Sequence, residues 1–137
     1  CAGFLTKRFG GAISALDPAA EPLRQKLQSN ERCWNPIGLL YADREFGKAV
    51  REIGHLLDEI NEYIDQQKPW DLAKVAAEGE RLQRVCSTAL TFFWYATVML
   101  RPILPHTAER VRDFLDLRAE DMNWGQFEAL PRGHRIK

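Results

Sequence analysis

The chain has 137 residues, 45% hydrophobic and 28% charged, which is the composition of a single soluble globular domain able to bury a core. Basic and acidic residues number 19 each, so the net charge is zero and binding of nucleic acid through bulk positive charge is excluded. Three widely spaced cysteines, Cys1, Cys33 and Cys86, match neither a disulfide framework nor a zinc pattern and favour a reducing compartment.

No signal peptide is visible, and the longest apolar run, residues 89–100, falls short of the ~20 residues that a membrane span needs. We therefore expect a cytoplasmic protein without a membrane partner. The chain opens without an initiator methionine or a helix start signal, which predicts a fragment of a longer protein.

Residues 2–9 are predicted to form the end of a helix that Gly10 and Gly11 stop. Lys7 and Arg8 fall in its last turn, where cations either complement the helix dipole or contact a phosphate. A loop over residues 10–18 follows.

A helix is predicted over residues 20–42, because apolar side chains recur at helical spacing. They are Leu23, Leu27, Trp34, Ile37 and Tyr41. Pro36 should kink or restart this helix, with Asn35 as cap, since an interior proline costs ~3 kcal/mol. Trp34 and Tyr41 are core candidates.

The next helix shows the clearest amphipathic pattern, with Asp43 as its expected N-cap. Its predicted core positions are Phe46, Val50, Ile53, Leu57, Ile60 and Ile64. Pro69 disfavours a helical Lys68 and ends this helix, which leaves Trp70 on a turn. An indole there is either a cap over the helix ends or a stacking surface for a ligand.

After this turn, Asp71 is expected to cap a short helical piece and Gly79 to loosen the joint before a helix over residues 80–100. The second half of that helix is apolar on nearly every side, so it is either central in a bundle or meets another domain of the parent protein. We favour the centre.

Pro102 and Pro105 break the chain, and Thr107 is the expected cap of a last helix that ends near Leu115 or Leu117, with His106 as a turn residue. Residues 122–137 lack a helical period, and the tail over residues 118–137 is expected to pack along the bundle or dock on a neighbouring domain. The prediction is thus an all-α bundle of four to five helices with an irregular C-terminal tail, one domain over residues 1–137.

Chemistry-bearing motifs are absent from the sequence. There is no glycine-rich phosphate loop, no pair of carboxylates standing out of a helical face, and His55, His106 and His134 are too scattered to hold a metal. We expect no catalytic, cofactor-binding or metal-binding residue in this chain.

The Lys68-Pro69-Trp70 turn with Leu72-Ala73-Lys74 resembles the segment that joins two helices in the anticodon-binding bundle of methionyl-tRNA synthetases, which are class I enzymes. Four further matches occur in the same order along the chain: Ala2-Gly3-Phe4 with Lys7-Arg8-Phe9, residues 44–53, Arg101-Pro102-Ile103-Leu104-Pro105, and Gly133-His134. Together they span nearly the whole chain.

The resemblance implies that Trp70, aimed by Pro69, stacks on an anticodon base of the tRNA for methionine. Lys68, Arg8 and Lys7 are weaker candidates for tRNA contacts. In that family the other anticodon-reading residues, asparagines and an arginine, lie on the helix before the position of Cys1. Methionine activation with ATP and transfer to tRNA belong to a catalytic domain that is the expected partner within the parent protein.

Two other interpretations stay open. One is the same bundle from a related synthetase for leucine, isoleucine, valine or cysteine, although residues 44–53 and the Gly133-His134 tail favour methionine. The other is a helical protein-interaction scaffold in which Trp70 is a structural cap.

Overall fold

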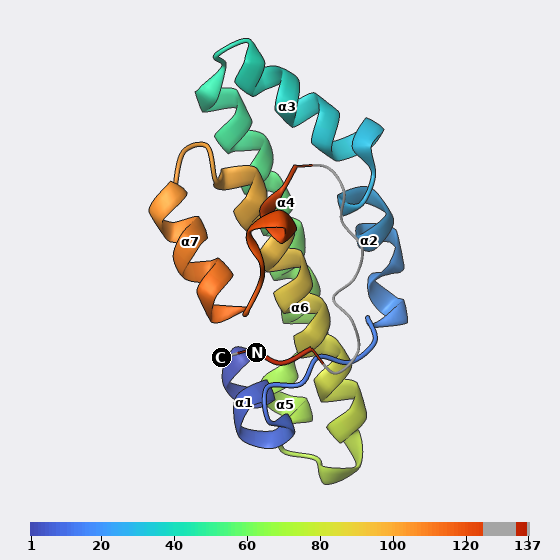
Figure 1. The fold of residues 1–137 in the computed structure, drawn as a ribbon. Coiled ribbons are helices and arrows are strands. Elements are labelled where there is room, and N and C mark those ends of the chain that lie inside the picture. The colour runs from blue at the N-terminus through green and yellow to red at the C-terminus, as the bar shows by residue number, and fades with distance from the viewer. Residues whose placement is uncertain (125–133, 137) are drawn as a thin grey trace.

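The computed structural model describes residues 1–124 and 134–136, and these residues form the predicted all-α bundle (Figure 1). Its centre is a pair of long helices, α4 (Phe46–Gln67) and α6 (Gly79–Leu100), which run in opposite directions along each other. Between them the chain turns through the short helix α5 (Pro69–Leu72) and a 3₁₀ turn (Ala76–Glu78).

The first helix, α1 (Ala2–Phe9), packs against α6 and ends as predicted. Gly10 adopts the left-handed conformation with φ of 60° and ψ of 26° and caps the helix by donating its N–H to Leu5 O. Leu5 is fully buried, whereas Lys7 and Arg8 are exposed in the last turn. The buried side of α1 therefore anchors a terminus whose cations face solvent.

The predicted helix over residues 20–42 is two helices, α2 (Glu21–Leu27) and α3 (Asn35–Ala42), joined by a π-helical turn (Asn30–Trp34). The break lies at Ser29 and not at Pro36, because the Ser29 hydroxyl accepts the backbone N–H of Arg32 at 3.1 Å and starts a new turn there. Pro36 occupies the second position of α3, where its missing N–H costs nothing. Asn35 is correspondingly the first residue of α3 and not its cap.

Of the two core candidates in this segment, Trp34 is fully buried and donates its indole N–H to Leu27 O at 2.7 Å. Tyr41 is half-buried and donates its hydroxyl to Met99 O at 2.8 Å. The ring of Trp124, from beyond α7, meets Trp34 edge-on with 4.9 Å between centroids.

The start of α4 differs from the prediction. Helix α3 ends at Ala42, with Asp43 as its C-cap. Arg44 then takes a left-handed φ of 59° and reverses the chain, so Glu45 precedes α4 without a side-chain cap. Phe46 and Val50 are 52% and 43% exposed rather than core. The buried stripe that faces α6 steps by four and three through Ala49, Ile53, Leu56, Ile60 and Tyr63.

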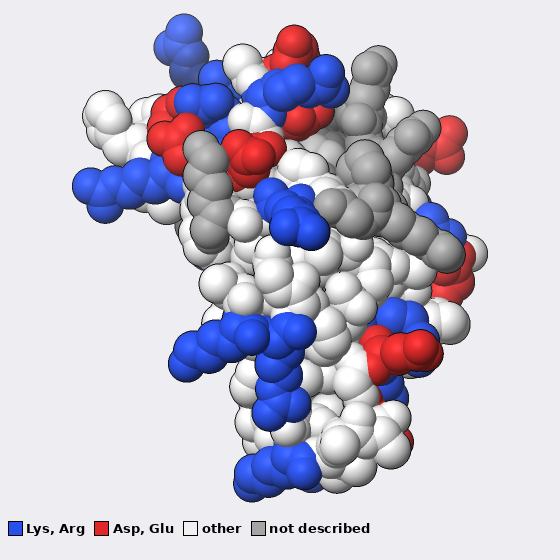
Figure 2. All heavy atoms as spheres, turned by 60° about the horizontal axis from the view of Figure 1, so that its bottom comes forward, with Lys and Arg blue, Asp and Glu red and all other residues white. Residues whose placement is uncertain are grey.

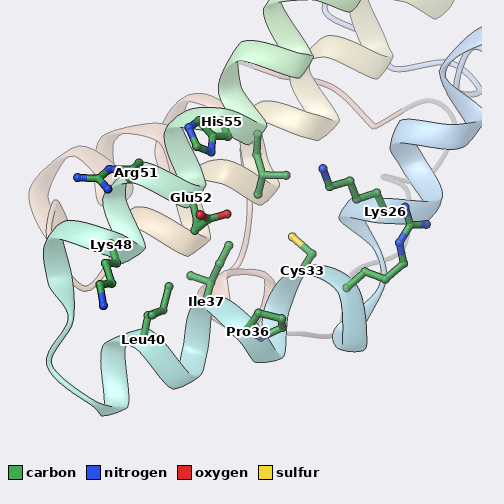
Figure 3. Close-up of a pocket in the computed structure, with 11 residues that line it drawn as sticks. Lys26, Cys33, Pro36, Ile37, Leu40, Lys48, Arg51, Glu52 and His55 are labelled. Carbon is green, nitrogen blue, oxygen red and sulfur yellow. The ribbon is translucent and has the colours of Figure 1, made fainter.

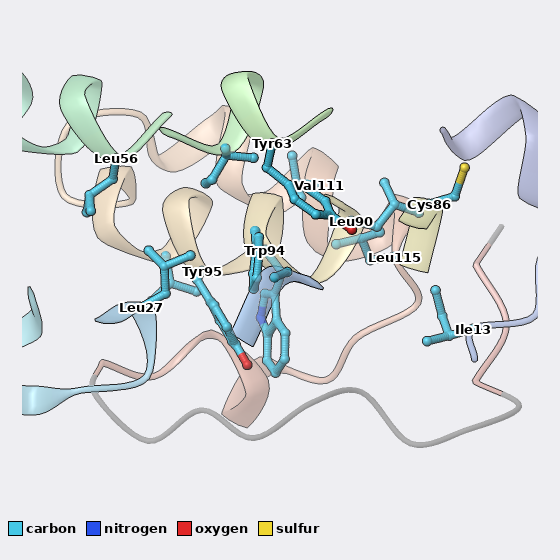
Figure 4. Packing of buried hydrophobic residues seen from close by; sticks show 14 of the residues in the cluster. Ile13, Leu27, Leu56, Tyr63, Cys86, Leu90, Trp94, Tyr95, Val111 and Leu115 are labelled. Atoms are coloured by element: carbon cyan, nitrogen blue, oxygen red, sulfur yellow. The ribbon is translucent and has the colours of Figure 1, made fainter. Parts of the chain in front are cut away.

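Helix α6 is buried on almost every side from Val85 to Met99, which confirms the central position predicted for it. Its one outward apolar side chain in this stretch is Phe93, at 41% exposure. Gly79 is the first residue of this helix and not a loosened joint, since the preceding 3₁₀ turn leads straight into it. Figure 4 shows side chains from α2, α4, α6 and α7 meeting around this helix.

The last helix, α7 (Pro105–Phe114), begins earlier than predicted. Pro105 has a pre-set φ and needs no hydrogen-bond partner, so it opens the helix after Leu104. Thr107 and His106 consequently lie inside its first turn, and neither is a cap or a turn residue.

Beyond α7, a 3₁₀ turn (Ala119–Met122) packs Met122 into the core, and residues 134–136 return beside the loop after α1. Ile136 donates its backbone N–H to Gly11 O at 3.0 Å, and Ile13 donates to His134 O at 2.7 Å. Gly133, half of one family motif, lies outside the described residues. Residues 134–136 thus lie against the loop that follows α1 (Figure 1).

A polar network fixes the loop between α1 and α2 to the central helices. The Tyr63 hydroxyl donates to the Asp17 carboxylate at 2.7 Å, and the Asp17 N–H donates to Thr88 Oγ1 at 2.8 Å. The Ser14 N–H donates to Ser87 Oγ at 2.9 Å. Three polar side chains within the bundle are thereby satisfied by one loop.

Candidate nucleic-acid interface

The corner that carries Trp70 is built by a reversal of the backbone at Lys68. Lys68 has φ of 49° and ψ of 64°, a left-handed conformation that ends α4, and its N–H donates to Ile64 O at 2.9 Å. Its own carbonyl accepts the N–H groups of Asp71 at 2.9 Å and Leu72 at 3.1 Å, which starts α5 at once. Asp71 is therefore a residue of this helix and not the cap that the sequence predicted.

Three apolar residues around Trp70 hold this corner on the bundle. Pro69 is buried at the first position of α5, and Leu72 and Ala73 are each only 9% exposed where α5 packs on α6. These anchors, together with the fixed φ of Pro69, leave the backbone of residues 69–73 little freedom.

Trp70 itself is 45% exposed, so part of its side chain is open to solvent. Within residues 1–124 and 134–136 its indole makes no hydrogen bond and no ring contact, in contrast to Trp34, whose N–H is satisfied at Leu27 O. Such a partly open aromatic surface on a fixed backbone is suited to stacking on a flat ligand.

The cations that the sequence analysis named lie at the same end of the molecule. Figure 1 places α1 and α5 together at the end opposite the α3–α4 turn. Lys7, Arg8 and Lys68 are exposed, and none of them forms an ion pair with any residue in the described part of the chain. On the lower left of Figure 2, which turns this end toward the viewer, lysine and arginine side chains stand on a surface without acidic side chains between them.

Two further cations at this corner were not singled out from the sequence. Arg81, in the first turn of α6, donates to the Gln67 side chain at 3.1 Å and so ties the start of α6 to the end of α4. Lys74 lies 3.8 Å from Asp71 in an exposed pair, which contributes at most ~1 kcal/mol. The sequence feature that could have located Arg81 is the short connection between α4 and α6, because it places the first turn of α6 beside the last turn of α4.

The described residues contain no group of three or more His, Cys, Asp or Glu side chains placed to hold a metal ion. Burial raises the pKa of the Cys33 and Cys86 thiols to about 11, so both are protonated at neutral pH. None of the helices in this part of the chain combines the length and apolar character that a bilayer crossing requires.

The comparisons with known proteins point to one family. Residues 15–137 match the family model described as the anticodon-binding domain of methionyl tRNA ligase. A methionine–tRNA ligase of Methylibium petroleiphilum is 43% identical over 135 residues, which are 98% of this chain and 19% of that protein. A methionine–tRNA ligase of Ralstonia nicotianae is 43% identical over 129 residues, or 93% of this chain and 18% of that protein.

Among solved structures, the apo form of methionyl-tRNA synthetase from Mycobacterium tuberculosis superposes with a TM-score of 0.84. It covers 98% of this chain and 28% of that protein at 17% identity, so the likeness concerns the fold. The chain thus spans about a fifth of the length of the ligases that it matches in sequence.

Proposed function

Since the chain belongs to the anticodon-binding domain family of methionyl-tRNA ligases, we propose that it binds the anticodon loop of the tRNA for methionine, with Trp70 stacking on an unpaired base. The observation that carries this proposal is the open indole on a corner anchored by buried neighbours. Proteins read single-stranded RNA loops by splaying bases onto aromatic side chains. Because the corner is fixed before binding, little ordering entropy is lost when a base arrives.

The proposed site comprises Trp70 and Pro69, with Lys68, Arg8 and Lys7 as nearby cations able to contact phosphates. Stacking is worth ~1–3 kcal/mol per base, which is enough for tenfold or more in affinity but not for full specificity. The remaining selectivity would come from polar groups that bond the edges of the bases. The net charge of the chain is zero, but these cations form no ion pair with the described residues and therefore attract the phosphates of RNA locally.

For the parent protein, we propose the activity of a cytoplasmic methionine–tRNA ligase, in which residues 1–137 form the anticodon-binding domain. Attachment of methionine with ATP would occur in a separate catalytic domain. The family match and sequence identities support methionine over the related leucine, isoleucine, valine and cysteine enzymes.

The test compares Trp70→Ala, Trp70→Phe and the unchanged chain for binding to an RNA stem-loop with a methionine anticodon, measured by fluorescence anisotropy. We expect binding about tenfold weaker for W70A and an intermediate loss for W70F, which keeps a smaller stacking face. The same stem-loop with its anticodon bases replaced is the control for selectivity.

Thermal unfolding of the same variants separates this proposal from the scaffold interpretation. A half-exposed side chain contributes little to the core, so W70A should melt close to the unchanged chain. A large loss of stability together with unchanged RNA binding would instead identify Trp70 as a structural cap.

A further inference from the structure

A cavity lies at the opposite end of α4 from Trp70, between α3 and α4 (Figure 3). Its volume is about 430 Å³, within the range of pockets that bind ligands. Its central residue on α4, Glu52, precedes Gln67 by fifteen residues, which at the helical rise is roughly 22 Å from the Trp70 corner. The base-stacking function proposed above makes no use of this cavity.

The floor of the cavity is aliphatic. Ile37 from α3 and Leu56 from α4 are buried at 3% and 5% exposure, and Leu40 is half-buried beside them. The Cys33 thiol faces the same space. Its protonated state adds to the apolar character, because burial holds its pKa at about 11. An occupant must therefore bring an apolar side chain of its own.

The rim of the cavity is predominantly cationic. Arg32 comes from the π-helical turn before α3, whereas Lys48 and Arg51 come from the first half of α4 and lie at one end of the cavity (Figure 3). The side chains of Arg32 and Arg51 form no ion pair with any of the described residues. Lys48 lies 3.8 Å from Glu45, and both side chains are exposed. Lys26 is already neutralised by Glu59 at 2.7 Å.

One carboxylate, that of Glu52, points toward the centre of the cavity (Figure 3). It also lacks an ion pair among the described residues. A carboxylate in this place can accept a backbone N–H from a bound chain, but it repels an acidic side chain placed directly over it. The acidic groups of an occupant must therefore lie toward the two ends, over the arginines.

We infer that this cavity docks an acidic segment of a partner protein, with an aliphatic side chain over Ile37, Leu40 and Leu56 and carboxylates over Arg32, Lys48 and Arg51. Arginine forks match carboxylates in geometry, and clusters of them commonly bind acidic motifs.

Nucleic acid fits this cavity less well. Its eleven lining residues include no phenylalanine, tyrosine or tryptophan, so His55 is the one aromatic ring among them on which a base could stack, and the aliphatic floor offers nothing to a phosphate. This contrasts with the Trp70 corner, where the exposed side chain is itself a large aromatic ring.

The experiment titrates the isotopically labelled chain with a short peptide in which a leucine pair is flanked by glutamates on both sides, followed by NMR. We expect shifts at Cys33, Ile37, Leu40 and Leu56, with binding that weakens as salt is raised. A peptide with lysines in place of the glutamates and a uridine oligonucleotide are the competing probes. Equal binding of the lysine peptide, larger shifts at these cavity residues with the oligonucleotide than with the acidic peptide, or an absence of shifts in the cavity would each overturn the inference.

Charge variants sharpen the test. R51E should weaken peptide binding by about fivefold to tenfold, since it replaces an attraction with a repulsion. E52Q should strengthen binding, because it removes the central repulsion and keeps an acceptor. K74E, which makes the same charge change as R51E but lies near the Trp70 corner, is the matched control and should leave binding unchanged. If K74E weakened binding as much as R51E, only the overall charge would matter and the cavity would be excluded.

Discussion

Gly11 is the residue whose replacement should most clearly loosen the contact between the end of α1 and the returning C-terminal segment. Its φ is +78°, and a Cβ added there would lie 2.8 Å from the backbone oxygen of Ile136. That oxygen belongs to backbone, so a Gly11→Ala variant can relieve the overlap only by displacing residues 134–136.

The cost of this substitution has two parts. A left-handed conformation costs an L-residue ~1–2 kcal/mol. Displacing residues 134–136 breaks the hydrogen bonds from Ile136 N to Gly11 O and from Ile13 N to His134 O, each worth ~1 kcal/mol. We therefore expect G11A to lose about 3–4 kcal/mol of unfolding free energy.

Gly10→Ala is the matched control. Gly10 also has a positive φ of +60°, but its added Cβ would meet nothing within 4 Å, so G10A should lose only ~1–2 kcal/mol. Urea unfolding followed by circular dichroism measures both losses. Faster hydrogen exchange at the Ile136 amide should accompany G11A alone. Equal destabilisation of the two variants would refute the reasoning about this contact.

Three further predictions follow from single side chains. Burial and the hydrogen bond to Asp17 raise the pKa of Tyr63 above its usual ~10. The folded state then holds the Tyr63 proton more tightly, so unfolding free energy should fall as pH rises above ~10, and Tyr63→Phe should flatten this fall while losing ~1–2 kcal/mol at pH 7. The Cys33 and Cys86 thiols should resist iodoacetamide at pH 8 in the folded chain and react once guanidinium unfolds it, whereas fast alkylation of the folded chain would contradict their burial. Lys68→Gly should raise stability by up to ~1 kcal/mol in urea unfolding, since glycine removes the left-handed cost at φ 49°, and a loss of stability would show that the lysine side chain supports the corner.

The periodic elements could be predicted from the sequence because local chemistry determines them. The spacing of apolar residues located α4 and α6, and Gly10 and Pro69 ended the helices that precede them. These residues act through their own backbone preferences, which the surrounding fold cannot easily override.

Helix starts were less predictable, because several cap-forming residues compete within a few positions. Asp43 and Thr107 have suitable side chains, yet the left-handed Arg44 and the helix-initiating Pro105 decide where α4 and α7 begin. The helical segment over residues 20–42 is interrupted at Ser29, upstream of Pro36. Such outcomes depend on which of the competing local conformations the packed chain stabilises most.

The candidate site was partly accessible from the sequence. The position of Trp70 after Pro69 predicted an indole at a corner, and the structure places it there with 45% exposure. The bond from Arg81 to Gln67 was indicated only by the short connection between α4 and α6. The cavity between α3 and α4 depends on how helices pack across the bundle, which no local pattern encodes.

The most direct measurement of the central claim is the NMR signal of the Trp70 ring as a methionine anticodon stem-loop is added. Stacking on a base should shift the ring protons of Trp70 upfield and leave those of the buried Trp34 unchanged. The Trp70 shift should disappear when the contacted base is replaced by an abasic nucleotide. If the stem-loop binds the chain while the Trp70 signals stay where they were, the indole does not meet the anticodon and the account is wrong.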